Sequence, residues 1–237
     1  MRRWSALGSL LLVVVVAACG SETPSPSGGA TRTSVPAPSS GTQSTPEPTP
    51  ILAGAGADAV FDPIVLKGKG DKTVPFAIPD DAVGLAALSH PVGGAFEVQA
   101  VDETGADTQT LVKVNGKYQG VVLFDLVDHS VAFKVHAKGP WAITVQPIAG
   151  AAAWDGTSTL KGKGDTMVRL TAPSADGATV AMRSTGKSRF TLRAHSADDD
   201  ALLFTGKGPV KGQVKLPDGT TLLEIRAGGA WSIAPGS

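Results

Sequence analysis

The sequence predicts an all-β protein with two tandem antiparallel β-sandwiches. Apolar and polar residues alternate in short segments such as 95–101 and 131–137, which is the pattern of half-buried strands. Glycine, proline and aspartate separate such segments about every 8–12 residues, the spacing typical of sandwiches. Several long stretches also recur later in the chain. The apolar run "GVVLFDL" at 120–126 predicts a central strand.

The recurring stretches keep a nearly constant spacing. "LKGKGDKTV" begins at Leu66 and "LKGKGDTMV" at Leu160, with seven of nine positions identical at an offset of 94. "FEVQAVDETG" from position 96 matches "FTLRAHSADD" from 190 at the same offset. "VAFKVHAKGPWAITV" from 131 matches "TLLEIRAGGAWSIAP" from 221 at an offset of 90. Solenoid units are about 20–50 residues long, so this longer period indicates tandem domains.

We expect one sandwich over 53–149, the first repeat, and another over 150–237, the second repeat. Each is jelly-roll-like or immunoglobulin-like, with roughly eight strands packed as two sheets face to face. The second repeat is about four residues shorter, since the offset falls from 94 to 90. We place this loss in the loop around 102–110.

The first 18 residues have the form of a secretory signal peptide. Arg2 and Arg3 precede an apolar run, and small residues follow before Cys19. The run from Leu10 to Ala18 has nine residues, too few to span a bilayer as a mature helix.

The stretch "VAAC" at 16–19 resembles the lipobox of bacterial lipoproteins. In that family the cysteine sulfur receives a diacylglyceryl group, and cleavage leaves this residue as the new N-terminus. Cys19 is the single cysteine of the chain, so it cannot form an internal disulfide. The resemblance implies a lipid anchor at Cys19 on the extracytoplasmic side of the cell membrane, held by two acyl chains. The alternative is an ordinary signal peptide with an incidental cysteine.

Residues 19–52 are predicted to form a disordered stalk behind the lipidated cysteine. Positions 20–50 contain seven prolines, seven serines and six threonines, without an aromatic residue. Such a segment buries too little apolar surface to offset its conformational entropy. It would average about 30 Å as a coil and reach roughly 95 Å as polyproline II. Its composition also suits O-glycosylation.

The repeated stretch "KGKGD" has two interpretations. As a tight turn, its glycines supply positive φ and its aspartates accept backbone hydrogen bonds. As an anion cradle, its lysines surround the glycine amides. It lacks the spacing of a phosphate-binding P-loop. We favour the turn. The glycines are Gly68, Gly70, Gly162 and Gly164, the aspartates Asp71 and Asp165, and the lysines Lys67, Lys69, Lys161 and Lys163.

Trp141 and Trp231 occupy the same point of the two repeats, in "GPWAI" and "GAWSI". We favour a core position, because tryptophan is highly buried on average. The alternative is a solvent-facing ring that stacks on sugar, as in carbohydrate-binding modules. Tyr118 has no aromatic counterpart in the second repeat, so the sequence does not indicate a shared aromatic platform.

The histidines and acidic loops give no convincing metal site. The four histidines do not show the sequence spacing of zinc ligands. His129 lies near Asp125 and Asp128 in the sequence, and there we favour a solvated loop over a metal site. The acidic loops offer only part of the six to eight oxygen ligands that calcium takes, so we favour charged hairpin loops. The histidines are His90, His129, His136 and His195, and the acidic loop residues are Asp102, Glu103 and Asp107, then Asp198, Asp199 and Asp200.

Charge and motifs argue against nucleic acid and catalysis. Removing 1–18 takes away Arg2 and Arg3, which leaves 19 basic against 21 acidic residues in the mature chain. Nucleic-acid binding normally needs a basic face, so we expect no such partner. The sequence contains no Gly-x-Ser-x-Gly nucleophile elbow, and no grouping of serine, histidine and aspartate indicates a catalytic triad. We expect no catalytic residue, metal or cofactor, and no enzyme activity.

The pattern "KGKGD … G-x-W-x-I" is similar to β-sandwich repeats of uncharacterised secreted actinobacterial proteins, and this resemblance implies a fold without an activity. We expect a lipid-anchored, extracytoplasmic, non-catalytic binding or scaffolding protein of the bacterial cell envelope. Its partner would be a cell-wall polymer or an envelope protein. The alternatives are a carbohydrate- or peptidoglycan-binding module, marked by exposed aromatic rows, and a small hydrolase, marked by a cleft with converging titratable groups.

Overall fold

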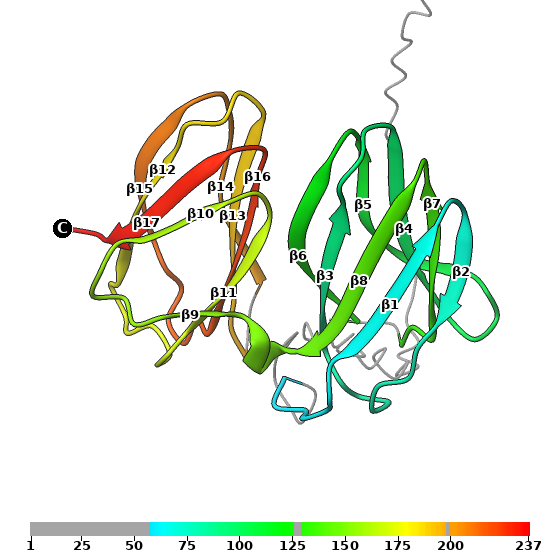
Figure 1. Ribbon diagram of the computed structural model, residues 1–237. Helices are drawn as coiled ribbons and strands as arrows, with labels where there is room; N and C mark the ends of the chain where they lie inside the picture. Colours follow the sequence, from blue (N-terminus) through cyan, green and yellow to red (C-terminus); the bar gives the residue numbers. More distant parts are fainter. Residues whose placement is uncertain (1–56, 126–128, 198–199) are drawn as a thin grey trace, which may run out of the picture. The chain divides into compact units, whose positions relative to one another are not determined.

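The computed structural model describes residues 57–125, 129–197 and 200–237, and the prediction of an all-β sandwich fold is confirmed (Figure 1). In these residues there are seventeen strands and a single 3-10 turn, η1 (Ile148–Gly150). None of their segments is a helix with the length and apolar character needed to cross a membrane. The predicted signal peptide, Cys19 and the predicted stalk over 19–52 lie outside the described residues.

The first repeat forms two four-stranded sheets from its described residues, with every neighbouring pair antiparallel. The strand orders are β1-β8-β3-β6 and β2-β7-β4-β5. Eight strands in two sheets fit the jelly-roll alternative, because the immunoglobulin constant type divides seven strands four and three. The strands are β1 (Ile64–Lys69), β2 (Lys72–Pro75), β3 (Gly84–His90), β4 (Ala95–Val101), β5 (Asp107–Asn115), β6 (Tyr118–Phe124), β7 (Ala132–Ala137) and β8 (Pro140–Pro147).

The second repeat has the same topology with each strand number raised by nine. Its sheets are β10-β17-β12-β15 and β14-β13-β16-β11-β9, and β9 is an addition that pairs in parallel with β11. The strands are β9 (Ala152–Trp154), β10 (Leu160–Lys163), β11 (Thr166–Leu170), β12 (Thr179–Ser184), β13 (Arg189–His195), β14 (Asp200–Lys207), β15 (Val210–Lys215), β16 (Leu222–Ala227) and β17 (Ala230–Pro235).

Each repeat has its own apolar core, built from the alternating positions of its strands. On β4 the inward residues Phe96, Val98 and Ala100 are fully buried. Phe190 and Leu192 on β13 are the equivalent residues of the second core. Period-two alternation therefore places one face of each strand against the opposite sheet.

A third apolar cluster joins the two repeats and explains one wrong expectation. The run at 120–126 is mostly β6, which is an edge strand and not a central one. Its inward residues Val122 and Phe124 belong to the first core, whereas Leu123 points to the third cluster. Both faces of this edge strand are therefore apolar. The cluster comprises Val83, Leu85, Leu123, Ile148, Ala151, Met167 and Leu222.

The shortening of the second repeat is divided between two places. In the first repeat Leu88 pairs with Gly120 and Ile143, whereas in the second Met182 pairs with Gly212 and Ile233. These equivalences give offsets of 94, then 92, then 90 along the chain. Placing the whole loss near 102–110 was therefore wrong, because half of it lies after β6. Every strand pair is kept, although the β4–β5 pair has two register shifts and the equivalent β13–β14 pair has one.

Candidate functional site

The repeated turn is built in the same way in both repeats. Gly70 and Gly164 have φ of 72° and 76°, as the turn interpretation requires. The Asp71 carboxylate accepts the amide hydrogen of Ala137 at 3.0 Å, and Asp165 accepts that of Ala227 at 2.8 Å. The Ala137 amide and the His136 ring both lower the pKa of the Asp71 carboxyl below its ordinary 3.8. These aspartates therefore tie the turn to the strand that runs beside it.

The other two glycines of the motif serve a different purpose. Gly68 and Gly162 lie within strands, directly opposite Trp141 and Trp231. A Cβ at Gly68 would lie 2.3 Å from the Trp141 ring, and one at Gly162 would lie 2.2 Å from the Trp231 ring. They do not have positive φ, contrary to the sequence-based expectation. Here glycine leaves room for an indole ring.

The two tryptophans are core residues. Trp141 is 3% exposed and Trp231 is 4% exposed. Each indole N–H donates to a carbonyl oxygen of the turn, Trp141 to Gly70 and Trp231 to Gly164, at 2.9 Å in both cases. Stacking on a sugar would require the rings to leave these positions.

The four motif lysines are exposed at alternate positions of two sheet-edge strands. Lys67 and Lys69 belong to β1, and Lys161 and Lys163 belong to β10. Charged side chains on an edge oppose strand pairing with other chains. Among these four described lysines, Lys163 alone lines the groove described next.

A groove of about 1090 Å³ is lined by residues of both repeats. The first repeat contributes residues of β3, β6 and β8, together with Val114 near the end of β5 and Lys117 in the turn that follows. The second contributes the turn between β10 and β11, the start of β13 and the end of β16. Its charged lining residues are Lys117, Lys163, Asp165, Arg189 and Arg226.

A hydrogen-bonded cluster centred on Asp165 lies at this groove. The Tyr118 hydroxyl donates to Asp165 Oδ2 at 2.8 Å, and Arg226 Nη1 lies 3.7 Å from the same oxygen. Arg226 also donates to the carbonyl oxygen of Leu111 at 3.1 Å. Burial and the Asp165 charge raise the pKa of Tyr118, so its hydroxyl remains a donor. Sequence reasoning missed this role, although the lack of an aromatic counterpart to Tyr118 was a signal.

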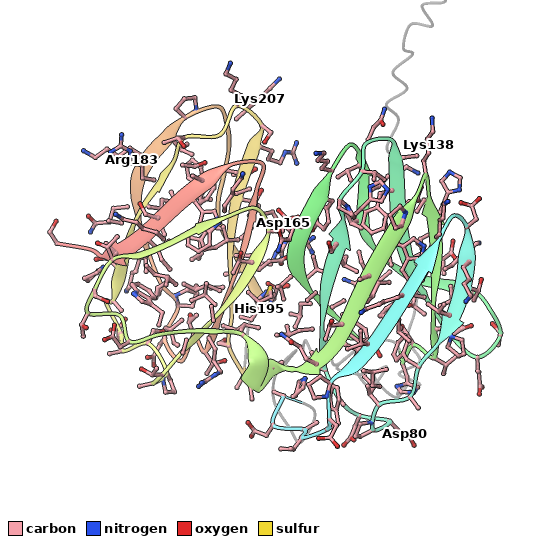
Figure 2. All side chains as sticks on the ribbon, viewed as in Figure 1. Asp80, Lys138, Asp165, Arg183, His195 and Lys207 are labelled. Atoms are coloured by element: carbon pink, nitrogen blue, oxygen red, sulfur yellow. The ribbon has the colours of Figure 1, made fainter. Side chains whose placement is uncertain are left out.

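A second charged cluster surrounds His195, at the end of β13 (Figure 2). The ring is 1% exposed, with Nδ1 3.4 Å from an Asp200 oxygen and Nε2 3.6 Å from a Glu224 oxygen. Arg193 pairs with Asp200 at 3.0 Å, and Arg226 pairs with Glu224. Burial alone would raise the pKa of Glu224, but His195 and Arg226 lower it to about 2. In the sequence, His195 was only a histidine without an equivalent in the first repeat. Its acidic partners could not be identified there, because strand pairing brings them close to it.

The remaining histidines have separate surroundings. His90 is buried in the first repeat, stacked on Phe96, with Nδ1 3.1 Å from the carbonyl oxygen of Gly116. His136 lies 2.8 Å from Asp71 on the surface. His129 lies 4.0 Å from Asp125, and Asp128 is outside the described residues.

The acidic loops contain local turn contacts. Asp102 Oδ1 accepts hydrogen bonds from the amides of Thr104 and Ala106, both at 2.9 Å, and from the Thr104 hydroxyl. These hydrogen bonds lower the pKa of the Asp102 carboxyl, and the one from the Thr104 hydroxyl has the largest effect. Asp198 and Asp199 lie outside the described residues. In the residues that are described, no three His, Cys, Asp or Glu side chains are grouped so as to hold a metal ion.

Comparisons with known proteins give no family. No family model matches the chain, and no curated protein matches it. The regulatory subunit of a cAMP-independent protein kinase A from Trypanosoma brucei aligns over 73% of this chain and 74% of its own, with 9% identity and a TM-score of 0.22. The subunit from Trypanosoma cruzi, bound to guanosine, aligns over 73% and 72%, with 10% identity and a TM-score of 0.19. At these TM-scores the alignments carry no argument about function.

Proposed function

We propose that this protein is a lipid-anchored, non-catalytic binding or scaffolding protein of the bacterial cell envelope, facing the extracytoplasmic side. The proposed partner is a cell-wall polymer or another envelope protein. The observation that carries the binding function is the groove, because both repeats line it with charged and hydroxyl-bearing side chains. Concave surfaces with a few convergent polar groups are the usual form of a binding site.

The charged groups at the groove favour binding over catalysis. Asp165 is engaged by Tyr118 and by Arg226, and Arg226 also pairs with Glu224. The raised pKa of Tyr118 makes its hydroxyl a poor general base at neutral pH. These groups hold the turn and the two repeats together, a structural role that is independent of any reaction.

A bulky side chain in the groove tests the binding function. Ala87 on β3 lines the groove, and Ala181 on β12 is its equivalent in the second repeat at the same offset of 94. We expect Ala87→Trp to abolish the capture of cell-wall glycans or envelope proteins in a pull-down, whereas Ala181→Trp retains it. Equal capture by both variants would refute the groove as the binding site.

The lipid anchor has its own test. If Cys19 carries the acyl groups, Cys19→Ser releases the mature protein from membranes, because an acyl-free stalk has no apolar segment. Cell fractionation at high salt measures this. A Cys19→Ser protein that still sediments wholly with the membrane would contradict the anchor.

The carbohydrate-binding alternative would be identified by the same pull-down. Neutral peptidoglycan fragments captured by the unmodified chain, and lost with Ala87→Trp, would favour it. The small-hydrolase alternative predicts turnover of a captured ligand, which binding alone does not produce.

A further inference from the structure

We propose that the groove binds a chain of polyol units linked by phosphodiesters, with Lys117, Lys163 and Arg189 contacting the phosphates. This inference rests on the binding function proposed above and names the chemical class of its ligand. The three cations come from separate places in the sequence. Lys117 immediately precedes β6, Lys163 ends β10 and Arg189 begins β13, and all three line the groove.

The cations of the groove exceed its anions. Four basic side chains line it, and Asp165 is the only acid among the described lining residues. Asp165 is paired with Arg226, which also pairs with Glu224. Lys117, Lys163 and Arg189 are exposed and form no ion pair with any described residue. A chain with a formal net charge of zero thus places three unpaired cations at one concave surface.

The uncharged lining suits a flexible polyol. Ala87 and Ser89 on β3 and Ala142 and Thr144 on β8 are half-buried lining residues with small side chains. Small side chains let a chain lie close to the sheet. The hydroxyls of Ser89 and Thr144, with the amide of Gln119, can donate and accept hydrogen bonds with polyol hydroxyls.

The groove lacks the aromatic platform that rings or bases require. Tyr118 is the only Phe, Trp or Tyr among its described lining residues. Its hydroxyl is engaged by Asp165, and its ring lies 6.0 Å from that of Phe96, measured between centroids. Binding of single-stranded nucleic acid relies on bases stacked on aromatic side chains. An unstacked, flexible chain therefore fits this groove better.

The cations also suit phosphate. Lysine is a common phosphate ligand that acts as a point charge, and the arginine guanidinium also pairs with phosphate. Two of the three unpaired cations are lysines, and they come from different repeats. We therefore assign the anionic groups to phosphates spaced along one chain, each met by a separate cation.

Isothermal titration calorimetry with the full chain in mild detergent tests the proposal. The probes are synthetic poly(glycerol phosphate), monomeric glycerophosphoglycerol, polyglutamate of equal charge and neutral dextran. The groove variant combines Lys117→Gln, Lys163→Gln and Arg189→Gln. The control combines Lys67→Gln, Lys161→Gln and Arg183→Gln, which removes the same charges from exposed residues outside the groove lining.

We expect the unmodified chain and the control to bind poly(glycerol phosphate) with similar affinity, and the groove variant to bind at least about tenfold more weakly. For a single-stranded polyanion, each phosphate contact contributes about −0.7 to the slope of log affinity against log salt concentration. Three contacts therefore predict a slope near −2. Both variants should keep their melting temperatures, since exposed substitutions change stability by about 0.5 kcal/mol or less. Weak binding of the monomer would show that the ligand is a polymer and not a lipid headgroup.

Three outcomes would overturn the inference. They are equal binding by the groove variant, equal binding of polyglutamate, and monomer binding as tight as that of the polymer. If poly(glycerol phosphate) does not bind, yet Ala87→Trp still abolishes capture of envelope material, the inference fails and the binding function stands. If Ala87→Trp captures normally, the proposed function itself fails.

Discussion

Adding a methyl group at Gly68 or Gly162 should damage the fold far more than removing any lysine of the same motif. The added Cβ would lie 2.3 Å and 2.2 Å, respectively, from the rings of Trp141 and Trp231. Carbon atoms in contact normally lie about 3.5–4.0 Å apart, so each ring would have to move by more than about 1 Å. Both rings are buried and held by a hydrogen bond to the turn.

The expected loss combines two terms. Overpacking a core costs about 1–3 kcal/mol, and leaving a buried donor without its partner costs about 1–3 kcal/mol more. We therefore expect Gly68→Ala and Gly162→Ala each to lower the free energy of unfolding by about 4 kcal/mol. For a repeat of this size that corresponds to a fall in melting temperature of roughly 16–32 °C.

Four variants calibrate this loss. Gly93→Ala adds a methyl group with no atom within 4 Å, and Gly212→Ala adds one within a strand, 3.3 Å from the flexible end of Met182. Gly70→Ala should lose only about 1–2 kcal/mol, because its φ is 72° but the space around it is open. Lys69→Gln should change stability by no more than about 0.5 kcal/mol.

Thermal and urea unfolding, followed by tryptophan fluorescence, measures these differences. If Gly68→Ala and Gly162→Ala melt within a few degrees of Gly93→Ala, the indole rings do not need the glycines. The structural account of the motif would then be wrong.

Two further predictions concern acid and the independence of the repeats. Because the Glu224 pKa is about 2 in the folded protein against an ordinary 4.5, its stabilisation is complete above about pH 4.5 and is lost as the pH falls toward 2. At about 1.36 kcal/mol per pKa unit, the difference between the two pKa values corresponds to about 3 kcal/mol of stability. The free energy of unfolding of Glu224→Gln in urea should therefore depend less on pH between 6 and 2.5 than that of the unmodified chain. Identical pH dependence of the two proteins would contradict the role of Glu224. Fragments 53–149 and 150–237 should each fold alone, since each repeat has its own core, but with reduced stability because the third apolar cluster becomes exposed. Circular dichroism checks this, and two fragments that fold only when mixed would show one interleaved domain.

The sequence by itself determined the fold class, the strand periodicity and the duplication of the fold. Alternation at 95–101 and 131–137 is a local property, and a strand with one buried face must show it wherever it lies. The duplication was visible because the two repeats keep identical or similar residues at equivalent turn and core positions. The positive φ at Gly70 was also a local property, since it depends on a single residue in a tight turn.

Only the tertiary structure decided which distant residues meet. Gly68 needs no positive φ but faces Trp141, 73 positions later, because β1 pairs with β8. His195 looked isolated in the sequence, yet strand pairing places it between Asp200 and Glu224. The groove likewise depends on tertiary structure, because residues of both repeats line it. No local sequence pattern predicts which strand faces of the two repeats lie next to each other. Long-range contacts of this kind depend on the register and order of the sheets, which the alternation of a single strand does not specify.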